Sequence, residues 1–270
     1  LAGWSGGGSL MMWYQALAEA GAGISDTAAG DPYTVAASRL PAATSIMMLA
    51  AHVSRHRIFT EWLDPSISDE SQPHLRDAQL NLYDAANPNQ PPYSADFLEH
   101  FAQAQVARNR RITAWVKEKL AAIRASDSPW REFAFTVHGT MADPRWLDPS
   151  IEPSDRKAGS CYLGDPKIVN DGPVGLARFC TLRSWLSQWS YDDARCDAIA
   201  SGSRISVPVL VIGNSADDAC TPSHTQRLYD AVTHEQKHLH VVKGATHYYT
   251  GANGAEHMAE ACGVIENFLA

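Results

Sequence analysis

Apolar residues along the chain follow two patterns. Spacing of three and four positions predicts helices over residues 9–20, 225–232 and 256–269. Continuous apolar runs, which are typical of strands buried in a parallel sheet, occupy residues 45–51, 207–212 and 239–242. This alternation of strands and helices near both ends of the sequence predicts the α/β class.

The segment between these two stretches has a different character. Residues 55–204 are polar and rich in tryptophan, and helical spacing predicts a long helix over 93–124 and a second over 175–189. We therefore expect residues 1–54 and 205–270 to build one core, a mostly parallel sheet flanked by helices. The segment 55–204 is expected to be a mainly helical insertion.

One hexapeptide, Trp-Leu-Asp-Pro-Ser-Ile, occurs twice, at Trp62–Ile67 and at Trp146–Ile151. No similarity flanks the two copies, which argues against a duplicated domain. We interpret both as a repeated turn, with Asp as a helix N-cap and Pro at the first helical position.

Charge and composition argue against several classes of function. The formal net charge of −8 argues against a nucleic-acid binder, whose affinity comes largely from Lys and Arg. No apolar run approaches the roughly 20 residues of a membrane span. The five cysteines are scattered and odd in number, so we expect a reducing, cytoplasmic setting and no structural zinc site.

The first residues carry a candidate nucleophile. Gly3-Trp4-Ser5-Gly6-Gly7 matches G-x-S-x-G, directly before a predicted helix. In this pattern a sharp strand-to-helix turn forces the serine into strained backbone geometry, and glycines two before and two after it avoid clashes. We therefore predict that Ser5 is a nucleophile and that the N–H of Gly6 is one oxyanion donor.

Candidate partners for this serine follow the last two predicted strands. Asp217 and Asp218 come after residues 207–212, and His247 follows residues 239–242. Open α/β sheets place functional groups at the carboxyl ends of their strands. We prefer Asp217 as the acid because of its spacing to Cys220 and the turn, and we keep Asp218 as the alternative.

Together these motifs resemble the α/β-hydrolase superfamily, in which the order is Ser, Asp, His. The resemblance covers residues 1–52 and 205–270 and implies an α/β-hydrolase fold in which the insertion forms a lid. It implies a serine hydrolase of esterase or lactonase type, with His247 as base and Asp217 orienting it. Alternatives are amide or C–C bond hydrolysis by the same triad, or a non-catalytic binding protein.

The resemblance also implies an incomplete catalytic domain. The family's second oxyanion donor comes from a loop after an early strand, and no such strand precedes Ser5. We therefore expect a missing N-terminal segment, or another chain, to complete the fold. Without that donor the activity is expected to fall by about 100-fold or more.

Several further residues are candidates for substrate contact. These are Trp4, which is also expected to pack against the sheet, together with His52, Tyr248 and Trp185. Aromatic side chains suit a small, fairly apolar ester-type substrate. The histidines lack clear metal-ligand spacing, so we expect neither a metal nor any other cofactor.

Overall fold

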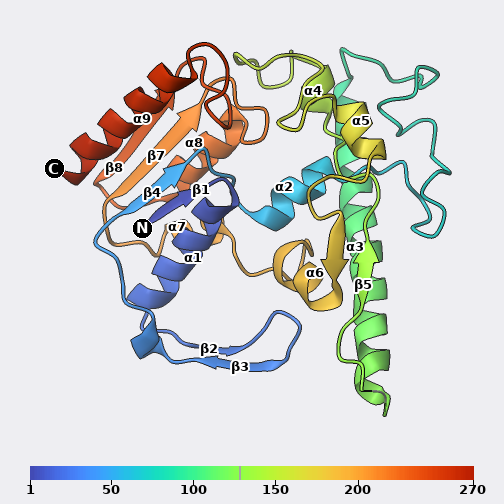
Figure 1. Ribbon diagram of the computed structural model, residues 1–270, viewed down its shortest axis with the longest axis horizontal. Helices are drawn as coiled ribbons and strands as arrows, with labels where there is room; N and C mark the ends of the chain where they lie inside the picture. The colour runs from blue at the N-terminus through green and yellow to red at the C-terminus, as the bar shows by residue number, and fades with distance from the viewer. Residues whose placement is uncertain (128) are drawn as a thin grey trace. The chain divides into compact units, whose positions relative to one another are not determined.

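The computed structural model describes residues 1–127 and 129–270, and the chain forms two units (Figure 1). The first comprises Leu1–Arg55, Glu152–Lys157 and Cys196–Ala270, and the second comprises His56–Ile151 and Ala158–Arg195. The second unit therefore differs from the predicted insertion in three places. Arg55 and residues 152–157 and 196–204 belong to the first unit.

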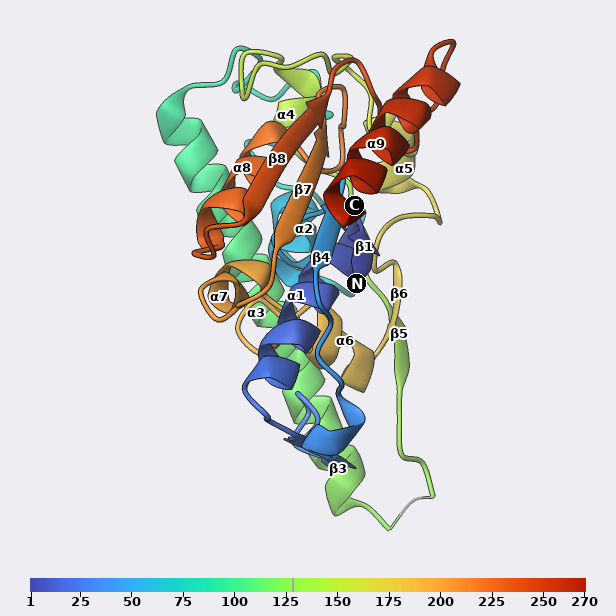
Figure 2. The same cartoon turned by 90° about the vertical axis from the view of Figure 1, so that its left-hand side faces the viewer.

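A four-stranded parallel sheet lies at the centre of the first unit, in the order β1-β4-β7-β8 (Figure 2). Its strands are β1 (Ala2–Trp4), β4 (Ile46–Leu49), β7 (Val209–Asn214) and β8 (Lys237–Val242). In register, Met48 lies between Gly3 and Val211. Because helices flank this sheet, the predicted fold class is confirmed.

Each face of the sheet packs against helices of its own. Side chains alternate between faces along a strand, so Val209 and Val211 of β7 pack in one cluster and Leu210 and Ile212 in another. The first cluster includes residues of α1 (Gly6–Glu19), α7 (Ala198–Gly202) and α8 (Pro222–Ala231). The second includes residues of α9 (Gly254–Leu269). A short antiparallel pair, β2 (Ile24–Asp26) and β3 (Pro32–Val35), and the 3-10 turn η1 (Ala37–Arg39) precede β4.

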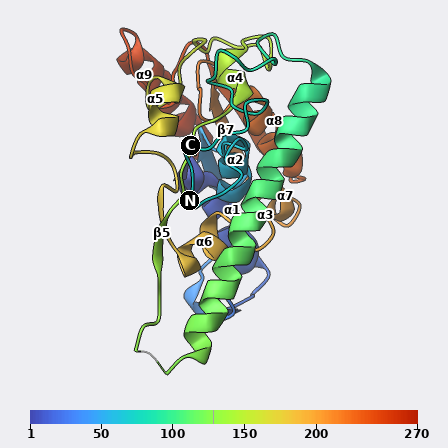
Figure 3. The same ribbon diagram turned by 90° about the vertical axis from the view of Figure 1, so that its right-hand side faces the viewer.

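The second unit consists of helices joined by long irregular segments, and a mainly helical insertion stays a prediction (Figure 3). Its helices are α2 (Arg55–Trp62, of which Arg55 belongs to the first unit), α3 (Ala95–Ala125), α4 (Pro144–Leu147), α5 (Pro166–Asp171) and α6 (Leu182–Gln188). An antiparallel pair, β5 (Ala134–Thr136) and β6 (Phe179–Thr181), completes it. The predicted helix over 175–189 is wrong in its first half, because residues 179–181 pair with β5. A capping box between Thr181 and Ser184 then starts α6.

The long helix α3 confirms the helix predicted over residues 93–124. It begins after Ser94, whose hydroxyl accepts the N–H of Phe97 at 3.2 Å. Its buried face includes Phe101, Ile112 and Leu120. Among the described residues no helix, α3 included, is both long and apolar enough to cross a membrane.

The repeated hexapeptide forms the same turn twice, although not the one predicted. Oδ1 of Asp64 accepts the N–H and hydroxyl of Ser66 at 2.9 and 2.6 Å, and Asp148 binds Ser150 with the same two distances. Each aspartate therefore closes a turn after a helix end, so its predicted role as an N-cap is wrong. The two tryptophans, Trp62 and Trp146, pack together with ring centroids 5.4 Å apart.

Candidate active site

Ser5 lies in a strained turn between β1 and α1. Its backbone angles are φ 54° and ψ −123°, in a region that residues other than glycine rarely adopt. Its N–H donates to the carbonyl of Leu49 at 3.1 Å, and its carbonyl accepts the N–H of Gly8 at 3.2 Å. Neighbouring backbone thus holds the strand-to-helix turn that the G-x-S-x-G pattern predicts.

Two glycines near this turn, Gly3 and Gly8, are too closely packed to carry a side chain. A Cβ on Gly3 would lie 2.4 Å from the carbonyl oxygen of Gly7, and one on Gly8 would lie 2.4 Å from Cβ of Ala51. A Cβ on Gly7 would meet nothing within 4 Å. The prediction that glycine is needed two positions after the serine is therefore wrong by one residue, because α1 turns Gly8 toward the end of β4.

Asp217 and His247 meet at the carboxyl ends of β7 and β8. Nδ1 of His247 lies 2.8 Å from Oδ2 of Asp217, and both side chains are buried. The other carboxylate oxygen of Asp217 accepts the N–H groups of Ala219 and Cys220 at 2.8 and 2.7 Å. These bonds fix the carboxylate, and the carboxylate in turn orients the imidazole with Nδ1 inward.

Asp218, the alternative acid, has a different environment. Burial, and next the negative charge of Asp217, raise the pKa of Asp218 to about 6. The carboxylate that accepts a hydrogen bond from Nδ1 of His247 is that of Asp217. Of the two neighbours, Asp217 has the geometry of an orienting acid.

The hydroxyl of Ser5 lies beside a second histidine. Oγ of Ser5 is 3.3 Å from Nε2 of His52, and the N–H of His52 donates to the carbonyl of Ser5 at 3.4 Å. His52 follows β4, which pairs with β1, so the two strand ends bring the residues together. The position of His52 after residues 45–51 indicated this end of the sheet, but no sequence signal indicated contact with the serine itself.

Aromatic rings surround His247. Trp4 contacts His247, Tyr248 and Tyr249 with centroid distances of 6.1, 6.1 and 6.0 Å, and Tyr248 lies 4.7 Å from His247. Trp4 is 40% exposed, so the expectation that it is buried against the sheet is wrong. As the residue before Ser5, it links the serine turn to the Asp217–His247 pair.

Trp185 lies in the interior of the second unit. It is fully buried, its indole N–H donates to Oγ1 of Thr113 at 2.9 Å, and its ring packs against Phe59 and Phe135. A tryptophan with its polar atom bonded and no exposed surface is a core residue. The expected substrate contact at Trp185 therefore does not fit its surroundings.

Gly6 begins α1, so its N–H has no partner within the helix. A Cβ at this position would lie 2.6 Å from Nε of Arg55, which places the Arg55 side chain beside the start of the helix. A helix N-terminus favours negative charge, and a nearby guanidinium adds to that preference. This end of α1 suits a developing oxyanion.

One group of side chains among the described residues has metal-ligating geometry. One atom each from Asp217, Cys220 and His247 lies within 4.8 Å of the others. In the structure, however, the Asp217 carboxylate binds the imidazole and two backbone N–H groups. That no metal takes part stays a prediction.

The order of these elements decides the fold. A strained serine follows β1, and the acid and histidine follow β7 and β8 of the same parallel sheet. This arrangement of a parallel sheet, a serine turn and an aspartate–histidine pair is typical of the α/β-hydrolase fold. The predicted parallel sheet flanked by helices is therefore confirmed in the part of the chain that carried the motifs.

Comparison with known proteins adds likenesses of structure only. No protein-family model matches the chain, and no curated protein matches it. Among solved structures it is similar to a monoacylglycerol lipase from Paleococcus ferrophilus, with 15% identity, TM-score 0.40 and 99% of this chain covered. It is also similar to DcsB in complex with its substrate analogue, with 14% identity, TM-score 0.39 and 99% of this chain covered. The chain spans 66% and 63% of those proteins, and likenesses this distant carry no conclusion about function.

Proposed function

We propose that this protein is a serine hydrolase that cleaves a carboxylic ester or lactone through an acyl-enzyme on Ser5. His247 acts as the base, Asp217 orients it, and the N–H of Gly6 donates to the oxyanion. The observation that carries the proposal is the buried 2.8 Å contact between Asp217 and His247, joined through Trp4 to a serine with φ 54°.

The chemistry follows from these groups. Neutral imidazole accepts the proton of the Ser5 hydroxyl while Oγ attacks the carbonyl carbon, and the carbonyl oxygen becomes an oxyanion beside Gly6. The imidazolium then gives its proton to the leaving alkoxide, and Asp217 stabilises the charged ring without taking its proton. Water, deprotonated by His247, releases the acid and restores Ser5.

His52 has a separate role in this proposal. Its Nε2 is 3.3 Å from the Ser5 hydroxyl, whereas the Asp217 carboxylate orients His247. A base needs an oriented ring whose charge is stabilised. We therefore assign proton transfer to His247 and positioning of the resting hydroxyl to His52, which also faces the substrate.

The substrate class rests on the rings at the site. Trp4 and Tyr248 are both exposed beside His247 and suit a small, fairly apolar acyl or alkyl group. The lid role that the α/β-hydrolase resemblance gives to residues 55–204 belongs to the same proposal. Amide and C–C bond hydrolysis by the same triad remain the alternatives, followed by a non-catalytic binding protein.

A fluorophosphonate probe tests the enzyme class. We expect the full-length protein to be labelled and Ser5→Ala not to be, since the probe reacts with activated serines. A folded full-length protein that is not labelled would overturn every hydrolase assignment and favour the binding protein.

A substrate panel then tests the bond. We expect turnover of p-nitrophenyl esters with short acyl chains and of lactones to exceed that of matched anilides by at least about 100-fold. Faster turnover of the anilides would overturn the ester assignment while leaving the triad in place.

A further inference from the structure

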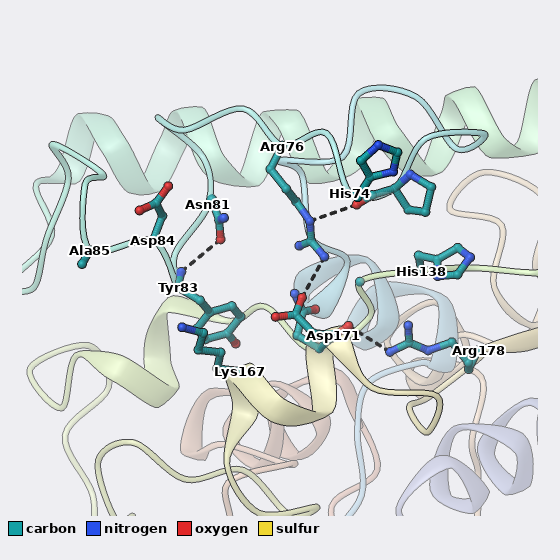
Figure 4. Close-up of a pocket in the computed structure, with 13 residues that line it drawn as sticks. His74, Arg76, Asn81, Tyr83, Asp84, Ala85, His138, Lys167, Asp171 and Arg178 are labelled. Atoms are coloured by element: carbon teal, nitrogen blue, oxygen red, sulfur yellow. Dashed lines mark hydrogen bonds and ion pairs between the residues drawn. The ribbon is translucent and has the colours of Figure 1, made fainter.

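A cavity of about 730 Å³ lies within the second unit, and none of its lining residues belongs to the proposed active site. Three cationic side chains, Arg76, Lys167 and Arg178, line it together with His74 and His138 (Figure 4). A wall of this kind is unusual in a chain whose formal net charge is −8. The cavity is therefore a candidate site for an anion.

Arg178 is the most informative residue of this wall. It is only 8% exposed, and its Nη2 donates to the carbonyl oxygens of Val169 and Asn170 at 3.1 and 3.2 Å. Its Nε is buried and has no acceptor among the described residues, where no carboxylate forms an ion pair with it either. A buried guanidinium without a counter-charge is costly unless a ligand supplies one.

In two other arginines of the same unit, carboxylates balance the positive charge. Arg108 is also buried, but it binds Glu70 through Nε and Nη2 at 2.9 and 2.6 Å and donates to three carbonyl oxygens. Arg76 pairs with Asp64 and, at 2.8 Å, with Asp171. Of these three arginines, Arg178 is thus the one without an ion pair among the described residues, since Asp171, whose charge acts on Arg178, pairs with Arg76.

The remaining groups of the wall supply a further cation and a neutral hydrogen-bond donor. Lys167 of α5 lines the cavity and has no ion pair among the described residues. Burial, then the charges of Arg178 and Arg108, lower the pKa of His138, so its neutral ring has a donor to offer. The one lining carboxylate besides Asp171 is Asp84, which Figure 4 shows at the end of the cavity away from Arg178.

We propose that this cavity binds a small organic anion whose carboxylate or phosphate group pairs with Arg178 and accepts a hydrogen bond from His138. A guanidinium binds either group through two parallel N–H donors. The volume leaves room for the organic part of the ligand. This site is separate from the proposed hydrolase site and does not rest on the proposed function.

The first test is calorimetric titration of the full-length protein with inorganic phosphate and with acetate, each against chloride at equal ionic strength. We expect Arg178→Gln to weaken binding at least about tenfold, since it removes the guanidinium that pairs with the anion. Arg178→Lys should retain part of the affinity. Arg110→Gln is the matched control, because Arg110 is an exposed arginine of the same unit that pairs with Asp192.

A second measurement uses the native chain and stays decisive if Arg178→Gln fails to fold. A bound oxyanion opposes the repulsion that Arg178, Arg108 and Arg76 exert on His138, so its pKa, read from the imidazole NMR signals, should rise. His240, paired with Glu260 in the first unit, should not respond. A response to phosphate alone or to acetate alone identifies the group. No change at His138 with either anion, or equal loss in Arg178→Gln and Arg110→Gln, would overturn the proposal.

Discussion

The hydroxyl of Ser5 lies 3.3 Å from Nε2 of His52, whereas the carboxylate of Asp217 lies 2.8 Å from Nδ1 of His247. Two histidines are therefore candidates for the base: His52 because it contacts the serine, and His247 because Asp217 orients its ring. The strand ends explain this arrangement, since β4 lies between β1 and β7 in the sheet.

Replacing each histidine separates the two roles. We expect His247→Gln to lower kcat for an ester by about 10³-fold or more, and His52→Gln to lower it by less than about tenfold. Steady-state kinetics of both variants provide the measurement. If His52→Gln were the more damaging change, the base would be His52 and the assignment of His247 would fail.

Asn substitutions at the neighbouring aspartates distinguish the acid. Asp217→Asn should lower kcat by roughly 10⁴-fold, because an amide favours the wrong imidazole tautomer and cannot stabilise imidazolium. Asp218→Asn should change kcat by no more than a few-fold. Both changes are isosteric, so circular dichroism serves as the folding control, and the reverse pattern would assign the acid to Asp218.

The pH dependence of stability carries a signature of Asp218. Its pKa is about 6 in the folded protein, above the ordinary 3.8, so the folded state holds this proton more tightly than the unfolded state. Its contribution to the free energy of unfolding is fully present at acid pH and is lost as the pH rises from about 4 through 6. Asp218→Asn should therefore be the more stable protein above pH 6, by on the order of 2 kcal/mol.

Urea unfolding between pH 4 and pH 8 measures this difference. Asp230→Asn, which changes an exposed carboxylate on α8, is the matched control and should leave the pH profile as in the wild type. A parallel profile for Asp218→Asn would mean that Asp218 is ionised as readily in the folded chain as in the unfolded one.

The glycines after Ser5 provide a test of the turn. Gly8→Ala should lower the free energy of unfolding by about 1–3 kcal/mol, because its Cβ would lie 2.4 Å from that of Ala51. Gly7→Ala meets open space on the same helix and should raise it by up to about 1 kcal/mol. Equal effects in urea unfolding would contradict the packing described for Gly8.

Much of the first unit was predictable because its signals are local. Apolar runs predicted β4, β7 and β8, and the G-x-S-x-G pattern predicted the strained turn at Ser5, since both depend on residues adjacent in sequence. In the second unit, periodicity predicted α3 but extended the helix of residues 175–189 through β6. Pairing with β5, more than 40 residues earlier, overrides helical spacing there.

The sequence by itself determined the order of serine, acid and histidine and the strands that carry them, because hydrophobic periodicity and backbone sterics act over a few residues. Only the tertiary structure decided that the carboxylate bonded to His247 is that of Asp217, that His52 reaches Ser5, and that Arg178 is buried without an ion pair among the described residues. Each of these depends on which strand ends and loops become neighbours. Packing between residues far apart in the chain determines which strand ends and loops are neighbours, and local sequence patterns do not predict it.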